Sequence, residues 1–242
     1  SGVLASTGNS TFTTAGAQSI TLNSASTYTG TVAFVASAGT LTNVTINDSG
    51  VFDLAALTLT GDLTVTAGGA ISDSGTLVVP GTTTIVAGAN NVVLDDAANN
   101  FGIVAVTSAG TATLVDVDAI DLGASTVTTL NVTAGGAISD SGTIVASGTT
   151  TIVAGANNVV LDEAANNFGI VAVTSAGTAT LVDVGAIDLG ATTVTTLNLT
   201  AGGAISDSGT IVASGTTTIV AGANNVVLDE AVNNFGIVAV TS

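Results

Sequence analysis

Three pairs of adjacent acidic residues recur at a fixed interval and are the first candidates for chemistry in this chain. The pairs are Asp95-Asp96, Asp162-Glu163 and Asp229-Glu230, and each stands at the same place in a 67-residue repeat. Two carboxylates can share the work of glycoside hydrolysis. Neighbouring residues of an extended strand point to opposite faces, however, so adjacent carboxylates make a poor acid/base pair. Because the pair also recurs three times, we interpret these residues as solvated corners.

The densest acidic cluster is formed by Asp116, Asp118 and Asp121. Carboxylate oxygens are ligands that Ca²⁺ prefers. The next copy of this segment carries Gly185 at the second of the three positions, so the set is not maintained. The Gly-Gly-x-Gly-x-Asp nonapeptide of calcium-binding β-rolls is also absent. We therefore expect diffuse attraction of counter-ions, and we predict no catalytic, cofactor-binding or metal-binding residue.

Composition excludes several further functions. The chain has 242 residues with 17 acidic side chains, no Lys, Arg, His or Cys, and a net charge of −17. Without cationic side chains it cannot neutralise phosphates, and an anionic membrane surface repels it. Without His and Cys the usual zinc and haem sites and the Ser-His-Asp and Cys-His nucleophiles cannot form. We predict that the chain is not an enzyme, binds no nucleic acid and inserts into no membrane.

A long internal repeat predicts the fold. Thr66–Val132 recurs as Thr133–Leu199 and in part as Thr200–Ser242, and residues 1–65 form a diverged copy. Self-similarity of this kind is typical of solenoids. Ala-Gly dipeptides recur within each repeat, ending at Gly88, Gly110 and Gly135 and again at their counterparts, and their spacing is the size of one solenoid coil. We therefore expect one continuous solenoid of about ten coils of roughly 20–25 residues, with three coils in each 67-residue repeat.

The strands of each coil are visible in the alternation of apolar and polar residues. A period of two is typical of a strand with one buried face, and Val and Thr favour strands. The chain is predicted to be all-β, without long helices. The residues expected to point inward in three sample strands are Val92, Leu94, Val104, Val106, Leu130 and Val132.

Asparagines mark the expected corners. The string Asn99–Gly102 returns at Asn166 and Asn233. A solenoid corner leaves backbone groups unpaired, and Asn amides can satisfy them. We therefore interpret these residues as structural turns. Each string contains a phenylalanine that we expect in the core, namely Phe101, Phe168 and Phe235.

Threonine strings raise the possibility of an ice-binding grid. The strings are Thr82–Thr84, Thr149–Thr151 and Thr216–Thr218. A grid needs Thr on every rung of the solenoid. With three coils in each repeat, one string falls on every third rung, about 14 Å from the next. We therefore reject this function.

Three strings in the repeats resemble a known family. They are Leu130–Gly142 (LNVTAGGAISDSG), Asn157–Gly169 (NNVVLDEAANNFG) and Ala186–Gly190 (AIDLG). Together they resemble repeats of giant bacterial surface proteins of the filamentous-haemagglutinin-like type, strongly from about Thr66 onward and loosely before it. The resemblance implies a right-handed parallel β-helix, export from the cell, and a role as an adhesin shaft or surface filament.

We expect a structural function outside a bacterial cell. The leading hypothesis is the shaft of a surface adhesin or a self-associating extracellular filament, with the chain itself, end to end, as the partner. The alternative is a module that binds polysaccharide or a host surface along the sides of the solenoid. An exposed row of aromatic residues would favour the alternative, but the chain has only six Phe and one Tyr.

Overall fold

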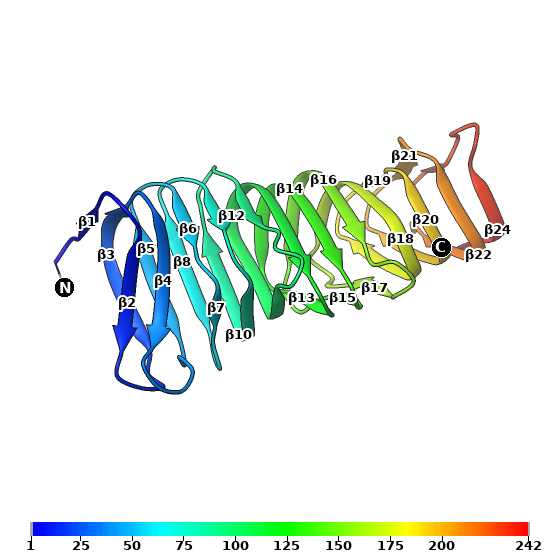
Figure 1. The fold of residues 1–242 in the computed structure, drawn as a ribbon. Helices are drawn as coiled ribbons and strands as arrows, with labels where there is room; N and C mark the ends of the chain where they lie inside the picture. Colours follow the sequence, from blue (N-terminus) through cyan, green and yellow to red (C-terminus); the bar gives the residue numbers. More distant parts are fainter. Residues whose placement is uncertain (1, 242) are drawn as a thin grey trace. The chain divides into compact units, whose positions relative to one another are not determined.

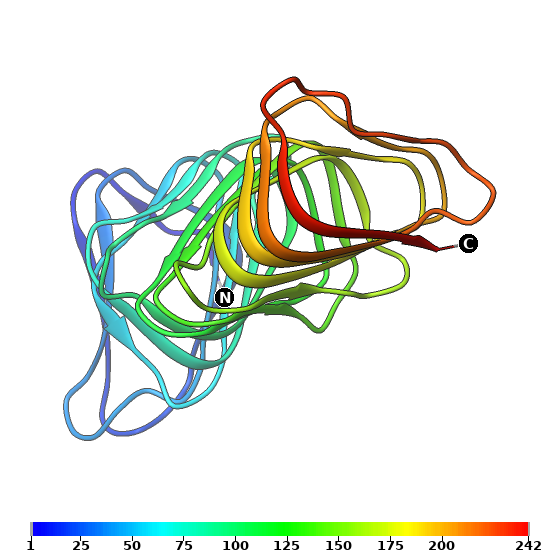
Figure 2. The same cartoon turned by 90° about the vertical axis from the view of Figure 1, so that its right-hand side faces the viewer.

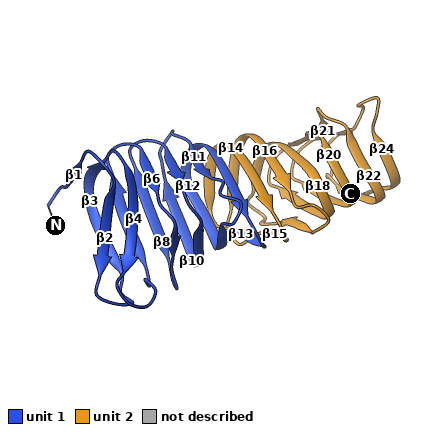
Figure 3. Ribbon diagram, viewed as in Figure 1, with its two compact units in different colours: residues 1–121 blue, residues 122–242 orange. Residues whose placement is uncertain are grey.

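The computed structural model describes residues 2–241 and divides into two compact units, Ser1–Asp121 and Leu122–Ser242 (Figure 3). Each unit is a parallel β-solenoid built from short strands and tight turns (Figure 1). The coils number about 12 in all and differ in length: Ala176 pairs with Val194 across a short coil, and Ile20 with Val44 across a long one. The described residues contain no helix, so none is long and apolar enough to cross a membrane. The prediction of an all-β solenoid is confirmed.

The strands of unit 1 lie in parallel register with those of neighbouring coils. They are β1 Ala5–Ser6, β2 Ser10–Thr14, β3 Ile20–Tyr28, β4 Thr31–Ala36, β5 Val44–Asp48, β6 Phe52–Leu54, β7 Leu57–Thr58, β8 Leu63–Ala67, β9 Ile71–Asp73, β10 Leu77–Val86, β11 Val92–Leu94 and β12 Asn100–Asp116. The short strand β13, Ile120–Leu122, spans the division between the units.

The strands of unit 2 form two parallel ladders. One ladder runs through β14, β16, β18, β19, β21 and β23, and the other through β15, β17, β18, β20, β22 and β24. The long strand β18 takes part in both ladders. The bounds are β14 Ser125–Ala134, β15 Ile138–Asp140, β16 Ile144–Val153, β17 Val159–Leu161, β18 Asn167–Asp183, β19 Ile187–Leu189, β20 Thr192–Ala201, β21 Ile205–Asp207, β22 Ile211–Val220, β23 Val226–Val227 and β24 Asn234–Thr241.

The predicted number of coils is wrong, because one 67-residue repeat makes about three and a half turns instead of three. The ladder that starts at Ile138 passes through Val159, Ala179, Leu197 and Thr217 in turn. The counterpart of Ile138 in the next repeat is Ile205. This residue lies in the sequence between Leu197 and Thr217, and it belongs to the opposite ladder. Likewise β16 and its counterpart β22 lie in different ladders. Successive repeats within unit 2 therefore face opposite sides of the solenoid.

The extra half turn falls within the longest interval between Ala-Gly dipeptides, which in unit 2 runs from Gly177 to Gly202. At one corner of unit 2 the Asn157 side-chain amide donates to the Gly135 carbonyl at 3.0 Å, and the Gly177 N–H donates to the Asn157 carbonyl at 2.8 Å. In the next coil, the residue that pairs with Ala176 is Val194, and the sequence has no Ala-Gly dipeptide there. Gly202 comes later, after the chain has moved to the other side. Counting dipeptides therefore misses a corner.

The core is lined by the residues that alternation predicted, all of which are buried: Val92, Leu94, Val104, Val106, Leu130 and Val132. Phe101 and Phe168 are also buried, as expected for core residues. Phe235 is only half-buried, contrary to the prediction. The reason is its position on β24, which pairs with β22 along one edge and has no strand on its other edge within residues 2–241 (Figure 2).

The threonine strings contribute to the core as well as to the surface. The middle residue of each string is fully buried, and its hydroxyl has no hydrogen-bond partner among the described residues: Thr83, Thr150 and Thr217. The flanking threonines point outward, because successive side chains of a strand alternate. A buried hydroxyl without a partner loses its hydrogen bonds to water and gains none in return.

We expect Thr150→Val to raise the free energy of unfolding by about 1 kcal/mol, because a methyl group replaces an unsatisfied hydroxyl. The matched control is Thr151→Val on the outward face, which should change stability by less than about 0.5 kcal/mol. Urea unfolding followed by circular dichroism measures both. A destabilised Thr150→Val variant would show that this hydroxyl makes a bond that the structure does not contain.

Candidate functional site: the buried carboxylates

Two sets of aspartates recur in the coils, and their carboxylates accept hydrogen bonds from the backbone of neighbouring segments. The first set, which we name the strand-end carboxylates, is Asp48, Asp116 and Asp183. The second set, the Asn-linked carboxylates, is Asp73, Asp140 and Asp207. Because the chain has no cationic side chain, amide N–H groups take the place that Lys or Arg would occupy in an ion pair.

Each strand-end carboxylate ties together two segments at a corner. Asp183 is 2% exposed and ends β18. Its Oδ2 accepts from the backbone N–H of Phe168, and its Oδ1 accepts from that of Gly185, both at 2.6 Å. Asp116 repeats this arrangement with the N–H groups of Phe101 and Asp118 at 2.6 and 2.7 Å. In both corners the carboxylate binds the backbone N–H of the core phenylalanine itself.

Asp48 is the counterpart of these residues in the first part of the chain. Its Oδ2 accepts from the backbone N–H of Tyr28 at 3.0 Å, and its Oδ1 accepts from Gly50 at 2.6 Å. Tyr28 therefore stands where Phe101 and Phe168 stand in the later copies. The Tyr28 side chain is buried, and its hydroxyl has no partner among the described residues. The corner is thus built in the same way even where the sequence has diverged.

The Asn-linked carboxylates join neighbouring coils through one buried amide. Asp140 accepts from the side chain of Asn166 at 2.5 Å and from the backbone N–H of Asp162 at 2.9 Å. The Oδ1 of Asn166, which is fully buried, accepts from the Ile144 N–H at 2.7 Å. The same bonds link Asp73 with Asn99 and Asp207 with Asn233. The predicted role of these asparagines as structural turns is confirmed, with a specific partner for each.

Burial raises the pKa of four of these carboxyl groups, those of Asp73, Asp116, Asp140 and Asp183. Loss of hydration is the largest cause, because it disfavours the charged form. Hydrogen bonds from amides act in the opposite direction and lower the pKa. The nearby carboxylate of Asp95 adds to the increase at Asp73. At each group the amide hydrogen bonds therefore offset part of the cost of burying the charge, and burial has the larger effect on the pKa.

The acidic pairs of the sequence lie where predicted, at exposed or half-exposed corners. They participate in the site through their backbone: the N–H groups of Asp162 and Glu163 donate to Asp140. Sequence reasoning missed the aspartate that receives these bonds. The sequence does contain a signal for this aspartate. The tripeptide Ile-Ser-Asp recurs in each 67-residue repeat, together with the acidic pair and the buried Asn.

The acidic cluster near residue 118 is only partly assembled. The Asp118 N–H donates to Asp116 at 2.7 Å, and the Asp118 carboxylate accepts from the Asn100 side chain at 3.3 Å. Asp121 has one buried carboxylate oxygen without a partner. Within residues 2–241 no group of three or more metal-ligating side chains is placed to hold an ion.

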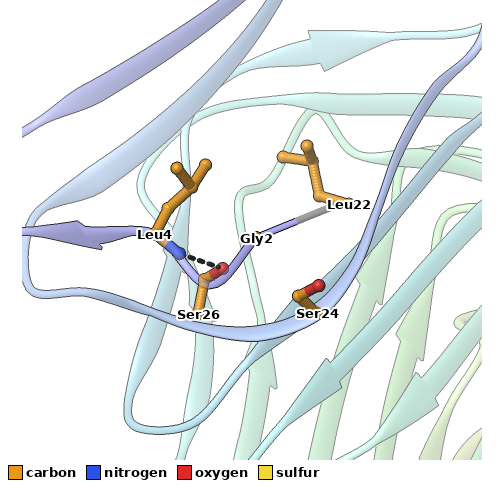
Figure 4. Close-up of a pocket in the computed structure, with 5 residues that line it drawn as sticks. All are labelled: Gly2, Leu4, Leu22, Ser24 and Ser26. Atoms are coloured by element: carbon orange, nitrogen blue, oxygen red, sulfur yellow. Dashed lines mark hydrogen bonds between the residues drawn. The ribbon is translucent and has the colours of Figure 1, made fainter.

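Two hollows lie in the first coils of unit 1. One has a volume of about 150 Å³ and is lined by Gly2, Leu4, Leu22, Ser24 and Ser26 (Figure 4). Within it the Leu4 N–H donates to the Ser26 hydroxyl at 3.0 Å. A second, of about 300 Å³, lies beside Tyr28, Val51 and Asp53. Neither hollow has a recurring carboxylate in its wall.

Comparison with known families gives one match. A family model described as repeats of unknown function (DUF5649) matches residues 41–108, 109–175 and 176–242. The strand-end carboxylate is the eighth residue of each matched segment, at Asp48, Asp116 and Asp183. No curated protein and no solved structure matches the chain.

We expect Asn166→Ala to lower the free energy of unfolding by roughly 2–3 kcal/mol, because it leaves the buried Ile144 N–H unpaired and removes one of the three donors to Asp140. The neighbouring Asn167 is exposed, so Asn167→Ala is the matched control and should cost less than about 0.5 kcal/mol. Chemical denaturation of both variants tests the difference. Equal effects at the two positions would contradict the assigned role of the buried amide.

We also expect the fold to become more stable as the pH falls from 7 to about 4. A carboxyl group whose pKa is raised above the ordinary 3.8 binds more protons in the folded state than in the unfolded state between these two pKa values. The contribution of this group to the stability of the fold is complete below pH 3.8, and it is lost as the pH rises through the raised pKa. Loss of the −17 charge acts in the same direction.

The measurement is the urea midpoint as a function of pH. Asp183→Asn removes one of the four shifted groups and should flatten the dependence, whereas Asp229→Asn, at an exposed corner away from all four groups, should leave it nearly unchanged. A midpoint that falls steadily from pH 7 to about pH 4 would be the opposite of the expected result.

Proposed function

The chain belongs to the family of repeats of unknown function (DUF5649), and on this premise we propose that it is a structural extracellular β-solenoid, either the shaft of a surface adhesin or a self-associating filament. The observation that carries the proposal is the recurrence of the same carboxylate–amide corner in copy after copy. The recurring aspartates and buried asparagines hold coil to coil, and the backbone of Phe101 and of Phe168 is bound by one of these aspartates. A chain of coils joined in this way is suited to form an extended shaft.

The resemblance of the repeats to filamentous-haemagglutinin-like surface proteins supports export to a bacterial surface. Composition supports the same location, because a chain without Lys or Arg offers no cleavage site to trypsin-like proteases. The lack of Cys means that the coils are stabilised by hydrogen bonds and packing and do not depend on redox conditions. We further propose that the partner of the chain is the chain itself, end to end, and that it is not an enzyme.

The alternative function is a module that binds polysaccharide or a host surface. It would be favoured by a row of exposed aromatic rings, since these supply large apolar contact surfaces to such ligands. In the described residues Tyr28, Phe34, Phe52, Phe101 and Phe168 are buried. Phe12 and Phe235 are half-buried and lie in different units. The arrangement of aromatic residues therefore supports the structural function.

Immunogold electron microscopy of the producing cells, with antibodies raised against the folded chain, tests the proposal. We expect gold particles along thin fibres or projections outside the cell envelope. A strain that lacks the gene is the control and should lose both the label and the fibres. Label confined to the cell interior, or fibres that persist unlabelled, would contradict the proposal.

A further inference from the structure

We propose that grids of outward threonines on the sides of the coils bind ice. This activity goes beyond the proposed structural function, and neither depends on the other. The sequence predicts one threonine string on every third rung, which would leave such a grid incomplete. The structure corrects this expectation, because threonines from other segments of the repeat occupy rungs next to the strings.

Unit 1 carries an outward threonine on four successive rungs. Thr21 of β3 pairs with Thr45 of β5, Thr45 pairs with Thr64 of β8, and Thr64 pairs with Thr84 of β10 (Figure 1). All four side chains are exposed or half-exposed. A second column of outward side chains lies beside the last three rungs and is formed by Asn47, Thr66 and Val86.

Unit 2 carries a corresponding grid on strands β18, β20 and β22. Thr178 pairs with Thr196, and Asn198 pairs with both Thr180 and Thr218. These side chains are half-exposed, and none of them is charged. A further column of outward side chains on the same three strands is formed by Val182, Thr200 and Val220.

The spacings of these grids are similar to those of the ice lattice. Neighbouring rungs are about 4.8 Å apart, and successive outward side chains of one strand are two residues, or about 6.7 Å, apart. Rows of oxygen atoms in hexagonal ice repeat at two distances close to these. The grid side chains point away from the sheet and not along the axis of the coils, so a coil that precedes or follows the chain leaves the grids uncovered.

The hydroxyl groups of the unit 1 grid are available to take the places of lattice water. Those of Thr45 and Thr64 make no hydrogen bond within residues 2–241. Thr174, which lies outside the grids, instead donates to the Ile152 carbonyl at 3.2 Å. A hydroxyl donates and accepts hydrogen bonds, as a water molecule in ice does, whereas a carboxylate only accepts them.

Charge is excluded from the grids although the chain carries 17 acidic residues. The nearest acidic side chain on the β8 rung is Asp62, two residues before Thr64. Asp62 lies at the border of the grid, and its Oδ1 accepts from the Thr82 N–H at 2.8 Å. A carboxylate orients water around its charge, so a surface without carboxylates leaves water free to adopt the order of ice.

Adsorption to ice tests the proposal directly. The chain has no Lys, so an amine-reactive dye labels only its amino terminus. We expect the labelled chain to be incorporated into a single ice crystal that grows slowly in its solution, and to slow the recrystallisation of ice grains in frozen sucrose. Labelled serum albumin is the control and should be excluded by the growing crystal. Exclusion of the chain as well would overturn the proposal.

Substitutions locate the activity on the grids. The test variant places a bulky ring in both grids and on the outward Thr151, which pairs with Asn131 on the other ladder of unit 2. Its three changes are Thr64→Tyr, Thr151→Tyr and Thr196→Tyr. The control variant changes the equivalent outward serines of the three repeats, in the short strands β9, β15 and β21 outside the grids. Its three changes are Ser72→Tyr, Ser139→Tyr and Ser206→Tyr.

We expect the grid variant to lose incorporation into ice and the serine variant to keep it, with circular dichroism showing both folded. Equal incorporation of the two variants would overturn the assignment to the grids. If the grid variant does not fold, adsorption of the unmodified chain still decides whether the chain binds ice. A chain that ice excludes leaves the proposed shaft function in place, and an intracellular immunogold label would remove that function without affecting adsorption to ice.

Discussion

The chain must place 17 carboxylates around an apolar core without a single cationic side chain. Burying a charge without compensation is costly, and the usual remedy is an ion pair. Here the remedy is the backbone of the neighbouring coil. Asp116 and Asp183 each accept two short bonds from amide N–H groups, and Asp140 accepts from two backbone amides and one side-chain amide. The need to satisfy these carboxylates fixes the positions of the corners.

The corners in turn set the register of the strands and the packing of the core. The N–H that binds Asp183 belongs to Phe168, so the carboxylate and the core ring are placed together. The amide that binds Asp140 also accepts the N–H that begins β16. A one-residue slip of any strand would turn its apolar side chains outward, and it would also leave a buried carboxylate without its partners. The same contacts therefore define both the coil and its neighbour.

Much of the fold could be predicted from the sequence, because Val92, Leu94 and their counterparts alternate with polar residues in a simple period. The number of coils could not, since the corner beside Val194 has no Ala-Gly dipeptide and the half turn there leaves no local signal. The importance of Asn166 was predicted, but its partner Asp140 was not, because the two are 26 residues apart and meet only when coils stack. Contacts between coils depend on register, which composition does not reveal.

The most direct test is an NMR titration of the amide protons of Phe168 and Gly185. Both should resonate far downfield at neutral pH, because they donate 2.6 Å bonds to a charged carboxylate. They should move upfield together as Asp183 is protonated, with a common midpoint above its ordinary pKa of 3.8. The amide of Val184, which donates to the Asn166 carbonyl, serves as the internal reference. Amide protons of Phe168 and Gly185 that do not respond to pH would contradict the claim that backbone amides hold this carboxylate in place of a cation. A midpoint at or below 3.8 would instead contradict burial as the largest influence on the pKa of Asp183.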